Sequence, residues 1–203
     1  LNPDGTRAGR DYDIAVVLKG PARAVRLREK QRVGGIWINA ESSDFRSVPS
    51  YFAIASSRPL KQIVDAKTAA IYELGLDFMQ LSPVGAIEPE EQRRFAAGLV
   101  DLRRRQGLYV QQEGSVTING QVLYQARIAL PSSVEPGVYT AETFAISGKR
   151  VVAAAVAKVE IRKTGFERFI EVAAERQSFI YGLVAVALSL LMGWAAGRLY
   201  AAM

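Results

Sequence analysis

The stretch Asp13-Ile-Ala-Val-Val-Leu18 is the most informative part of the N-terminal half of the chain, because five consecutive residues in it are apolar. A strand with one face in water alternates apolar and polar residues, whereas a strand covered on both faces reads as a short, continuous apolar run. The flanking segments, Asn2-Pro-Asp-Gly5 and Lys19-Gly-Pro21, have the composition of turns. We therefore expect a buried β-strand over residues 13–18.

Further short strands are expected on both sides of a central segment. Val25 and Leu27 alternate with arginines, which is the period of a strand with one face in water. Asn119-Gly120 fits the two positive φ angles of a type I′ turn and predicts a hairpin over residues 116–122. The longest strands are expected over residues 122–130, 138–147 and 150–162.

The central segment, residues 59–106, has helical features. Asp65 can cap a short helix, and Pro89 lies in the first turn of a longer helix that ends before Gly107. Strands separated by turns, in two groups, are typical of a sandwich. We therefore predict a mainly β fold for residues 1–163, an antiparallel Ig-like β-sandwich with a helical insertion at about residues 59–106.

The C-terminal part of the chain contains an apolar run, residues 179–197, in which no side chain is charged. A helix of this length, at about 1.5 Å per residue, extends roughly 28 Å, close to the hydrocarbon thickness of a bilayer. This predicts a transmembrane helix over residues 179–198. An amphipathic membrane-proximal helix is expected before it, over residues 164–178, and a short tail after it, over residues 199–203.

Small residues recur at every fourth position of this run, at Ala185, Ser189, Gly193 and Gly197. Such a ridge allows a second helix to approach closely, although small residues are also common in membrane helices generally. We favour the packing face, because the leucines lie mostly elsewhere on the helix. The predicted partners are the lipid bilayer and either a membrane protein or a second copy of the chain. Three residues near the end are expected to be interfacial anchors: Trp194, Arg198 and Tyr200.

A second candidate site lies in the N-terminal half. Two glycines, Gly34 and Gly35, precede Trp37 and Asn39, and Tyr51 follows closely. Glycines beside aromatic rings can form a recess that grips a ligand such as an envelope glycan or a small anion. The alternative, which we favour, is a tryptophan in the sandwich core with the glycines at a β-bulge.

The composition excludes several classes of chemistry. The chain has no cysteine and no histidine, which excludes thiol nucleophiles, disulfides, imidazole bases and the usual sites for zinc, copper or haem. The net charge is +6, but the basic residues are scattered without interleaved aromatics, so we expect no nucleic-acid partner. Asp11 and Asp13 are a candidate carboxylate pair, and a serine or tyrosine with a lysine could form a base-activated nucleophile. No spacing singles out either set, so we expect no enzymatic activity, cofactor or metal.

Several motifs resemble a family of putative alphaproteobacterial transmembrane proteins. The residues that carry the likeness extend over essentially the whole chain: Tyr12-Asp-Ile14, Lys19-Gly-Pro21, Gly35-Ile-Trp37-Ile-Asn39, Val48-Pro-Ser-Tyr51, Ser57-Arg-Pro-Leu60, Gly107-Leu-Tyr109, Leu130-Pro131, Pro136-Gly-Val-Tyr139 and Arg162-Lys-Thr-Gly-Phe166-Glu167.

The resemblance implies a leader, an exported β domain and a C-terminal anchoring helix, with further strands before the first residue of this chain. It supplies no catalytic residues. It also associates the chain with permeases of the sulfite-exporter type, which fits an accessory or assembly subunit. We accordingly expect a single-pass protein of the bacterial inner membrane with its β domain in the periplasm. The positive-inside rule points the other way, because five cations precede the anchor and only Arg198 follows it, but a leader-directed domain translocates largely regardless of nearby charge.

Overall fold

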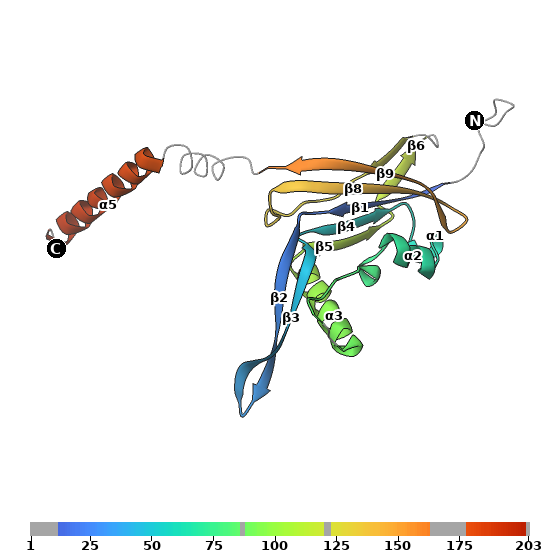
Figure 1. The fold of residues 1–203 in the computed structure, drawn as a ribbon. Helices are drawn as coiled ribbons and strands as arrows, with labels where there is room; N and C mark the ends of the chain where they lie inside the picture. Colours follow the sequence, from blue (N-terminus) through green and yellow to red (C-terminus); the bar gives the residue numbers. More distant parts are fainter. Residues whose placement is uncertain (1–11, 86–87, 120–122, 163–177, 202–203) are drawn as a thin grey trace. The chain divides into compact units, whose positions relative to one another are not determined.

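The computed structural model describes residues 12–85, 88–119, 123–162 and 178–201, and the chain divides into two units, Leu1–Ile161 and Arg162–Met203 (Figure 1). The strands of the first unit are β1 (Asp13–Lys19), β2 (Ala22–Val33), β3 (Ile36–Pro49), β4 (Phe52–Ser56), β5 (Tyr109–Glu113), β6 (Val116–Asn119), β7 (Leu123–Ala126), β8 (Gly137–Ser147) and β9 (Arg150–Ile161). Its helices are α1 (Leu60–Ile63), α2 (Ala66–Tyr72), the 3-10 helix η1 (Leu76–Phe78) and α3 (Pro89–Arg105). The second unit contains α5 (Ser178–Ala201).

The first unit is built on a five-stranded sheet in the order β5-β4-β1-β8-β9. The predicted buried strand is confirmed: β1 is the middle strand, and residues 14–18 are all buried. Its alternate residues belong to two different core clusters. Val17 belongs to the cluster that contains Leu60 and Leu99 of the helices, whereas Val16 belongs to the cluster that contains Val116 of β6. Both faces of β1 are therefore covered, which explains why its sequence does not alternate.

The sheet is mixed rather than antiparallel. β1 pairs antiparallel with β4 and β8, but β4 and β5 pair parallel, with Phe52 opposite Tyr109. Parallel neighbours require a crossover connection, and the helical segment provides it. The helices that we expected as an insertion between two halves of a sandwich therefore connect adjacent strands of one sheet, and they cover one face of it (Figure 1). The predicted mainly β composition is confirmed, whereas the second layer of an Ig-like sandwich is not observed among the described residues.

Two hairpins accompany the sheet. β6 and β7 pair antiparallel as predicted, although β7 ends at Ala126, well before the expected limit at Leu130. The residues of their turn lie outside the described ranges. β2 and β3 form a longer two-stranded ribbon that projects away from the sheet beside α3 (Figure 1). It is joined to the core at its base, where Phe45 and Val48 are fully buried.

The predicted helices are confirmed in place and in their capping. Asp65 accepts a hydrogen bond of 2.7 Å from the Thr68 amide at the start of α2. α3 has acidic residues in its first turn and three arginines in its last, as the helix dipole favours. Its buried residues are Phe95 and Leu99, whereas Leu102 is 44% exposed.

The C-terminal unit contains the expected helix. α5 covers residues 178–201, so it includes the apolar run. Within the described part of the chain, no helix is both long enough and apolar enough to cross a membrane, so the helix predicted over residues 179–198 is present but its transmembrane character is not confirmed. The amphipathic helix predicted over residues 164–178 lies almost wholly outside the described residues.

Candidate functional site

The predicted recognition residues Trp37 and Asn39 lie near the free end of the β2–β3 ribbon. Gly34 and Gly35 form its turn with φ of +59° and +87°, the left-handed conformation that a type I′ turn needs at both central positions. No atom lies within 4 Å of a Cβ built on either glycine, so they are selected by backbone conformation and not by a close neighbour. The glycines thus close a hairpin, and they form neither the bulge nor the recess that the sequence suggested.

One face of this ribbon tip is aliphatic. Residues directly opposite each other in an antiparallel pair project to the same side, and successive residues alternate. Val33 is opposite Ile36, and Gln31 is opposite Ile38. The three aliphatic side chains of this face are 56%, 69% and 45% exposed, respectively.

The other face of the tip combines cations with an aromatic ring. Arg32 is opposite Trp37, and Lys30 is opposite Asn39. The Arg32 Nε–H points back to the turn and donates a hydrogen bond of 3.4 Å to the Gly35 carbonyl. Trp37 is 65% exposed, so the core position that we favoured for it is not observed. A single aromatic residue does not form a periodic sequence pattern. The sequence therefore did not indicate that this part of β3 lies outside the core.

The base of the ribbon is fixed by ion pairs. Glu29 and Glu41 are opposite each other, and Arg94 of α3 reaches both carboxylates, at 3.4 Å from Glu29 Oε2 and closer to Glu41. The fork of Arg26 binds Asp44 at 2.6 and 2.8 Å. The contacts of Arg94 compensate the negative charges of Glu29 and Glu41, which would otherwise repel each other across the ribbon. The ribbon is therefore attached to α3 at its base, and its tip begins beyond the β-bulge at Glu29 and Lys30.

Tyr51 does not belong to this surface. Its side chain is fully buried, its hydroxyl donates a hydrogen bond of 2.9 Å to the Ala129 carbonyl, and its ring lies 6.1 Å from that of Tyr139. The proposed recognition surface therefore loses Tyr51 and keeps Trp37 and Asn39. Two other buried tyrosines are bound in the same way: Tyr109 donates to the Pro49 carbonyl and Tyr139 to the Glu135 carbonyl.

These tyrosines are poor candidates for acid–base chemistry. Burial raises the pKa of Tyr51, and burial raises the pKa of Tyr109 to about 12. A phenol with a raised pKa stays protonated at neutral pH, and here its proton is already given to a backbone carbonyl. Through these hydrogen bonds the three tyrosines connect the sheet to neighbouring segments of the chain.

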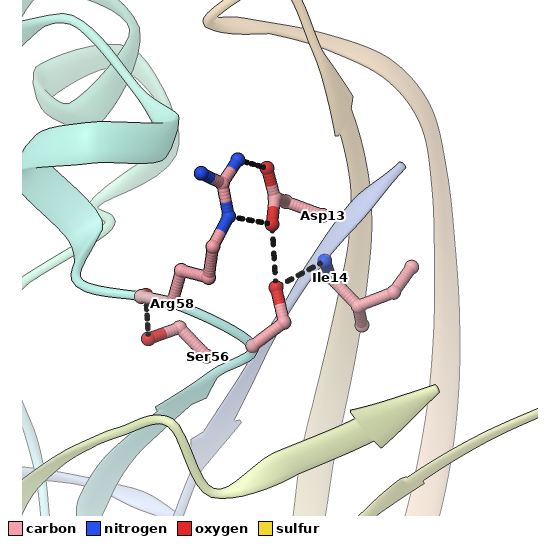
Figure 2. A network of polar contacts seen from close by, with 5 residues as sticks. Asp13, Ile14, Ser56 and Arg58 are labelled. Atoms are coloured by element: carbon pink, nitrogen blue, oxygen red, sulfur yellow. Dashed lines mark hydrogen bonds and ion pairs between the residues drawn. The ribbon is translucent and has the colours of Figure 1, made fainter. Parts of the chain in front are cut away.

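Asp13, half of the candidate carboxylate pair, is held in a structural network (Figure 2). The Arg58 guanidinium faces the carboxylate, with Nε at 2.8 Å from Oδ1, and the Ser57 hydroxyl donates to the same oxygen at 2.9 Å. That hydroxyl in turn accepts a hydrogen bond from the Ile14 amide at 3.2 Å. The hydrogen bonds from Arg58 hold the pKa of Asp13 below its ordinary value of 3.8, against the effect of burial. Asp13 thus ties the start of β1 to the end of β4, and Asp11 lies outside the described residues.

Lys19 is the most enclosed lysine of the sheet, and it is also paired. Its Nζ lies 2.7 Å from Glu73 Oε2 and 3.2 Å from Glu142 Oε2. Burial lowers the pKa of Lys19, but the hydrogen bond that Lys19 donates to Glu73 and the charges of both carboxylates outweigh this effect and raise that pKa. A lysine nucleophile needs a lowered pKa, so this environment is the opposite of the one that such chemistry uses.

An open groove of about 750 Å³ lies between α3 and the segment that follows α2. Apolar side chains, including Met79, Leu81 and Val100, form part of its lining. Its charged side chains are of both signs: Asp77, Arg93, Asp101 and Arg104. This mixture does not single out the charge of a ligand. Among the described residues, no three carboxylates come together as a metal site would need.

The ridge residues of α5 are exposed, as are the other described residues of the helix between positions 182 and 198, so their exposure does not test the predicted packing face. No atom lies within 4 Å of a Cβ built on Gly193 or Gly197, and the Ser189 hydroxyl donates a hydrogen bond of 2.9 Å to the Ala185 carbonyl. That bond occupies the only polar group of the ridge. Of the predicted interfacial anchors, Tyr200 is 87% exposed, and the Arg198 guanidinium lies 5.5 Å from the centre of the Trp194 ring.

Comparison with known proteins gives a family but no activity. A family model described as "Putative transmembrane protein (Alph_Pro_TM)" matches residues 1–201. The chain belongs to this family. No curated protein and no solved structure matches the chain. Membership of Alph_Pro_TM confirms the resemblance noted from the sequence motifs and supports association with a membrane.

Proposed function

We propose that this member of the Alph_Pro_TM family is a non-enzymatic accessory or assembly subunit of a larger membrane complex, and that it contacts the membrane through α5. The observation that carries the proposal is the apolar surface of α5 between Leu183 and Trp194. Its large apolar side chains from Leu183 to Trp194 are between 48% and 73% exposed. A helix that is apolar on every side is stable only inside lipid or another protein. Family membership and the uncharged run 179–197 support the lipid environment.

The ridge supplies the proposed contact with a partner. Within lipid, helices associate through close packing, because burial of apolar surface gives no advantage over contact with acyl chains. Gly193 and Gly197 offer backbone to a neighbouring helix, and the Ser189 hydroxyl already donates its proton within its own helix. The partner is then a membrane protein or, in the alternative arrangement, a second copy of this chain.

The ridge is tested by purifying the tagged, full-length protein from native membranes in a mild detergent. We expect the Gly193→Leu, Gly197→Leu variant to lose the co-purifying partner at least tenfold while it remains in the membrane fraction after carbonate extraction. The matched control is Ala187→Leu, Ala195→Leu, which adds a similar bulk on the other side of the helix, roughly 140° from the centre of the ridge. Equal loss from both variants, or from neither, would remove the ridge as the contact.

The proposed location is the bacterial inner membrane, with the first unit in the periplasm. The chain contains no cysteine, so a single Leu123→Cys substitution at a 65% exposed position creates one reporter. We expect a membrane-impermeant maleimide to label this residue in intact cells whose outer membrane is permeabilised. Labelling only after lysis would place the domain in the cytoplasm, as the positive-inside count suggests.

Only two of the three residues on which the ligand-binding alternative depended are exposed at the ribbon tip. It required Trp37, Asn39 and Tyr51 on one surface, and Tyr51 is in the core. The ribbon tip that carries Trp37 and Asn39 projects outward, whereas a ligand of drug size is normally held in a concave site. We therefore keep the accessory role as the proposed function.

A further inference from the structure

Four apolar side chains lie at the tip of the β2–β3 ribbon, residues 30–39, outside the buried core of the first unit. Val33, Ile36 and Ile38 share one face, and Trp37 lies on the other beside the turn. All four side chains are 45–69% exposed. Scattered exposed apolar residues are ordinary on a protein surface. Four exposed apolar residues around one two-residue turn form a cluster, and such clusters mark interaction sites.

The charges of the tip have one sign. Lys30 and Arg32 are its two ionisable residues, and no carboxylate occurs between Lys30 and Ala40. The acidic residues of the ribbon, including Glu29 and Glu41, lie at its base, where Arg94 binds them. Among the described residues, neither Lys30 nor Arg32 forms an ion pair with a carboxylate. The tip therefore presents apolar side chains together with two cations that are available to an anionic surface.

The dimensions of the tip also restrict its partner. Val33 lies four residues beyond the ion-paired Glu29, which is about 14 Å along an antiparallel strand. Elements that lie in a membrane interface place their apolar side chains about 5–10 Å below the headgroups. The tip is thus long enough to enter the interface while the ion-paired base and α3 stay in water. The two-glycine turn makes it narrow, and a narrow, outward-projecting tip suits a deformable lipid surface better than a flat protein surface.

We propose that the tip of the β2–β3 ribbon inserts into the headgroup region of an anionic lipid bilayer. Val33, Ile36 and Ile38 enter the apolar side of the interface, and the indole of Trp37 lies at its boundary, where tryptophan is enriched in membrane proteins. Lys30 and Arg32 contact the phosphate groups. This second membrane contact is separate from α5, and it does not depend on the accessory role.

The test uses Trp37 as its own reporter. The chain has two tryptophans, so a full-length Trp194→Phe variant leaves Trp37 as the sole source of tryptophan fluorescence. The variant is held in nanodiscs and mixed with vesicles of phosphatidylglycerol and phosphatidylcholine. A brominated, quenching phosphatidylcholine is placed either in the disc or in the vesicles, which shows whether the tip enters the membrane that holds α5 or a facing one. We expect at least twofold quenching of Trp37, with a blue shift of its emission, in one of the two arrangements.

Two sets of variants make the test specific. Lys30→Gln with Arg32→Gln should weaken binding to anionic vesicles, or the quenching within the disc, roughly tenfold or more, since each cation near an anionic surface contributes favourably. In the matched control, Trp37 and Trp194 are both changed to Phe and Leu123, which is as exposed as Trp37, is changed to Trp. This reporter should not be quenched.

Three outcomes would contradict insertion of the tip into lipid. Absence of quenching in both arrangements overturns the proposal, and so does equal quenching of the reporter at position 123. If Trp37 is shielded from aqueous acrylamide but not quenched by brominated lipid, its partner is a protein surface and the lipid proposal is wrong. None of these results bears on α5, because Trp194 is absent from the measurement.

Discussion

Replacement of Leu99 by alanine should lower the free energy of unfolding of the first unit by about 2–5 kcal/mol, the usual range for a fully buried leucine. Leu99 of α3 is fully buried and belongs to the core cluster that joins the helices to the sheet. The substitution removes apolar contacts and leaves a cavity, because the surrounding structure relaxes only partially around the missing side chain. Urea titration of the full-length protein in a mild detergent, followed by the near-ultraviolet circular dichroism of the buried tyrosines, measures the change.

The control for this prediction lies three residues along the same helix. Leu102 is 44% exposed, so Leu102→Ala removes less buried surface than Leu99→Ala and should lower the free energy of unfolding by about 1 kcal/mol or less. If both alanine variants were destabilised equally, α3 would not pack against the sheet through the Leu99 face. A smaller loss for Leu99→Ala alone would indicate that neighbouring side chains refill the cavity.

The local elements could be predicted because each has a signal within a few residues. The five apolar residues of β1 require two covered faces, Asp65 offers a carboxylate to the amide of Thr68, and the arginines of α3 follow the helix dipole. These features depend on neighbours in the chain, which the sequence contains directly.

The arrangement of the strands could not be predicted in the same way. The period of β5 does not say whether it pairs with β4 in parallel or antiparallel orientation, because the side chains alternate identically in both. The choice follows from where the helical crossover returns the chain, and Leu99 and the other buried residues of the helices determine that through tertiary packing. The antiparallel sandwich was expected from turn composition alone, which carries no information about this long-range pairing.

The candidate sites illustrate the same limit. Trp37 and Tyr51 were grouped because they are close in sequence, but β3 runs from the exposed tip to the core between them. A buried position was expected for Trp37 from its size, and the ribbon instead leaves it in solvent. The paired glycines did contain the correct signal, since Gly34-Gly35 between two β-prone segments is a hairpin signature, and the bulge that we favoured there is wrong.

The second large effect is expected at Gly20, whose replacement by alanine should cost about 1–3 kcal/mol. A Cβ at this position would lie 2.6 Å from the Ser50 hydroxyl oxygen and 2.9 Å from the Tyr51 backbone nitrogen. The Gly20 amide donates a hydrogen bond of 2.7 Å to the Tyr51 carbonyl, and the Ser50 amide donates to the Pro21 carbonyl at 2.9 Å. The two segments cannot separate to admit a methyl group without lengthening both bonds, so the substitution strains the junction between β1 and the ribbon.

An opposite sign is expected for the same change at Gly98, and the pair of substitutions isolates the cause. Gly98 is inside α3, and the nearest atom to a Cβ at this position, Leu27 Cδ2, would be 4.0 Å away. Alanine should therefore stabilise the helix by about 0.5–1 kcal/mol, because glycine loses more backbone entropy on folding. Both changes restrict the unfolded chain equally, so the difference between their urea midpoints measures the close approach at Gly20 itself. Stabilisation by Gly20→Ala would mean that the segments around Ser50 and Tyr51 lie further from Gly20 in solution than the structure places them.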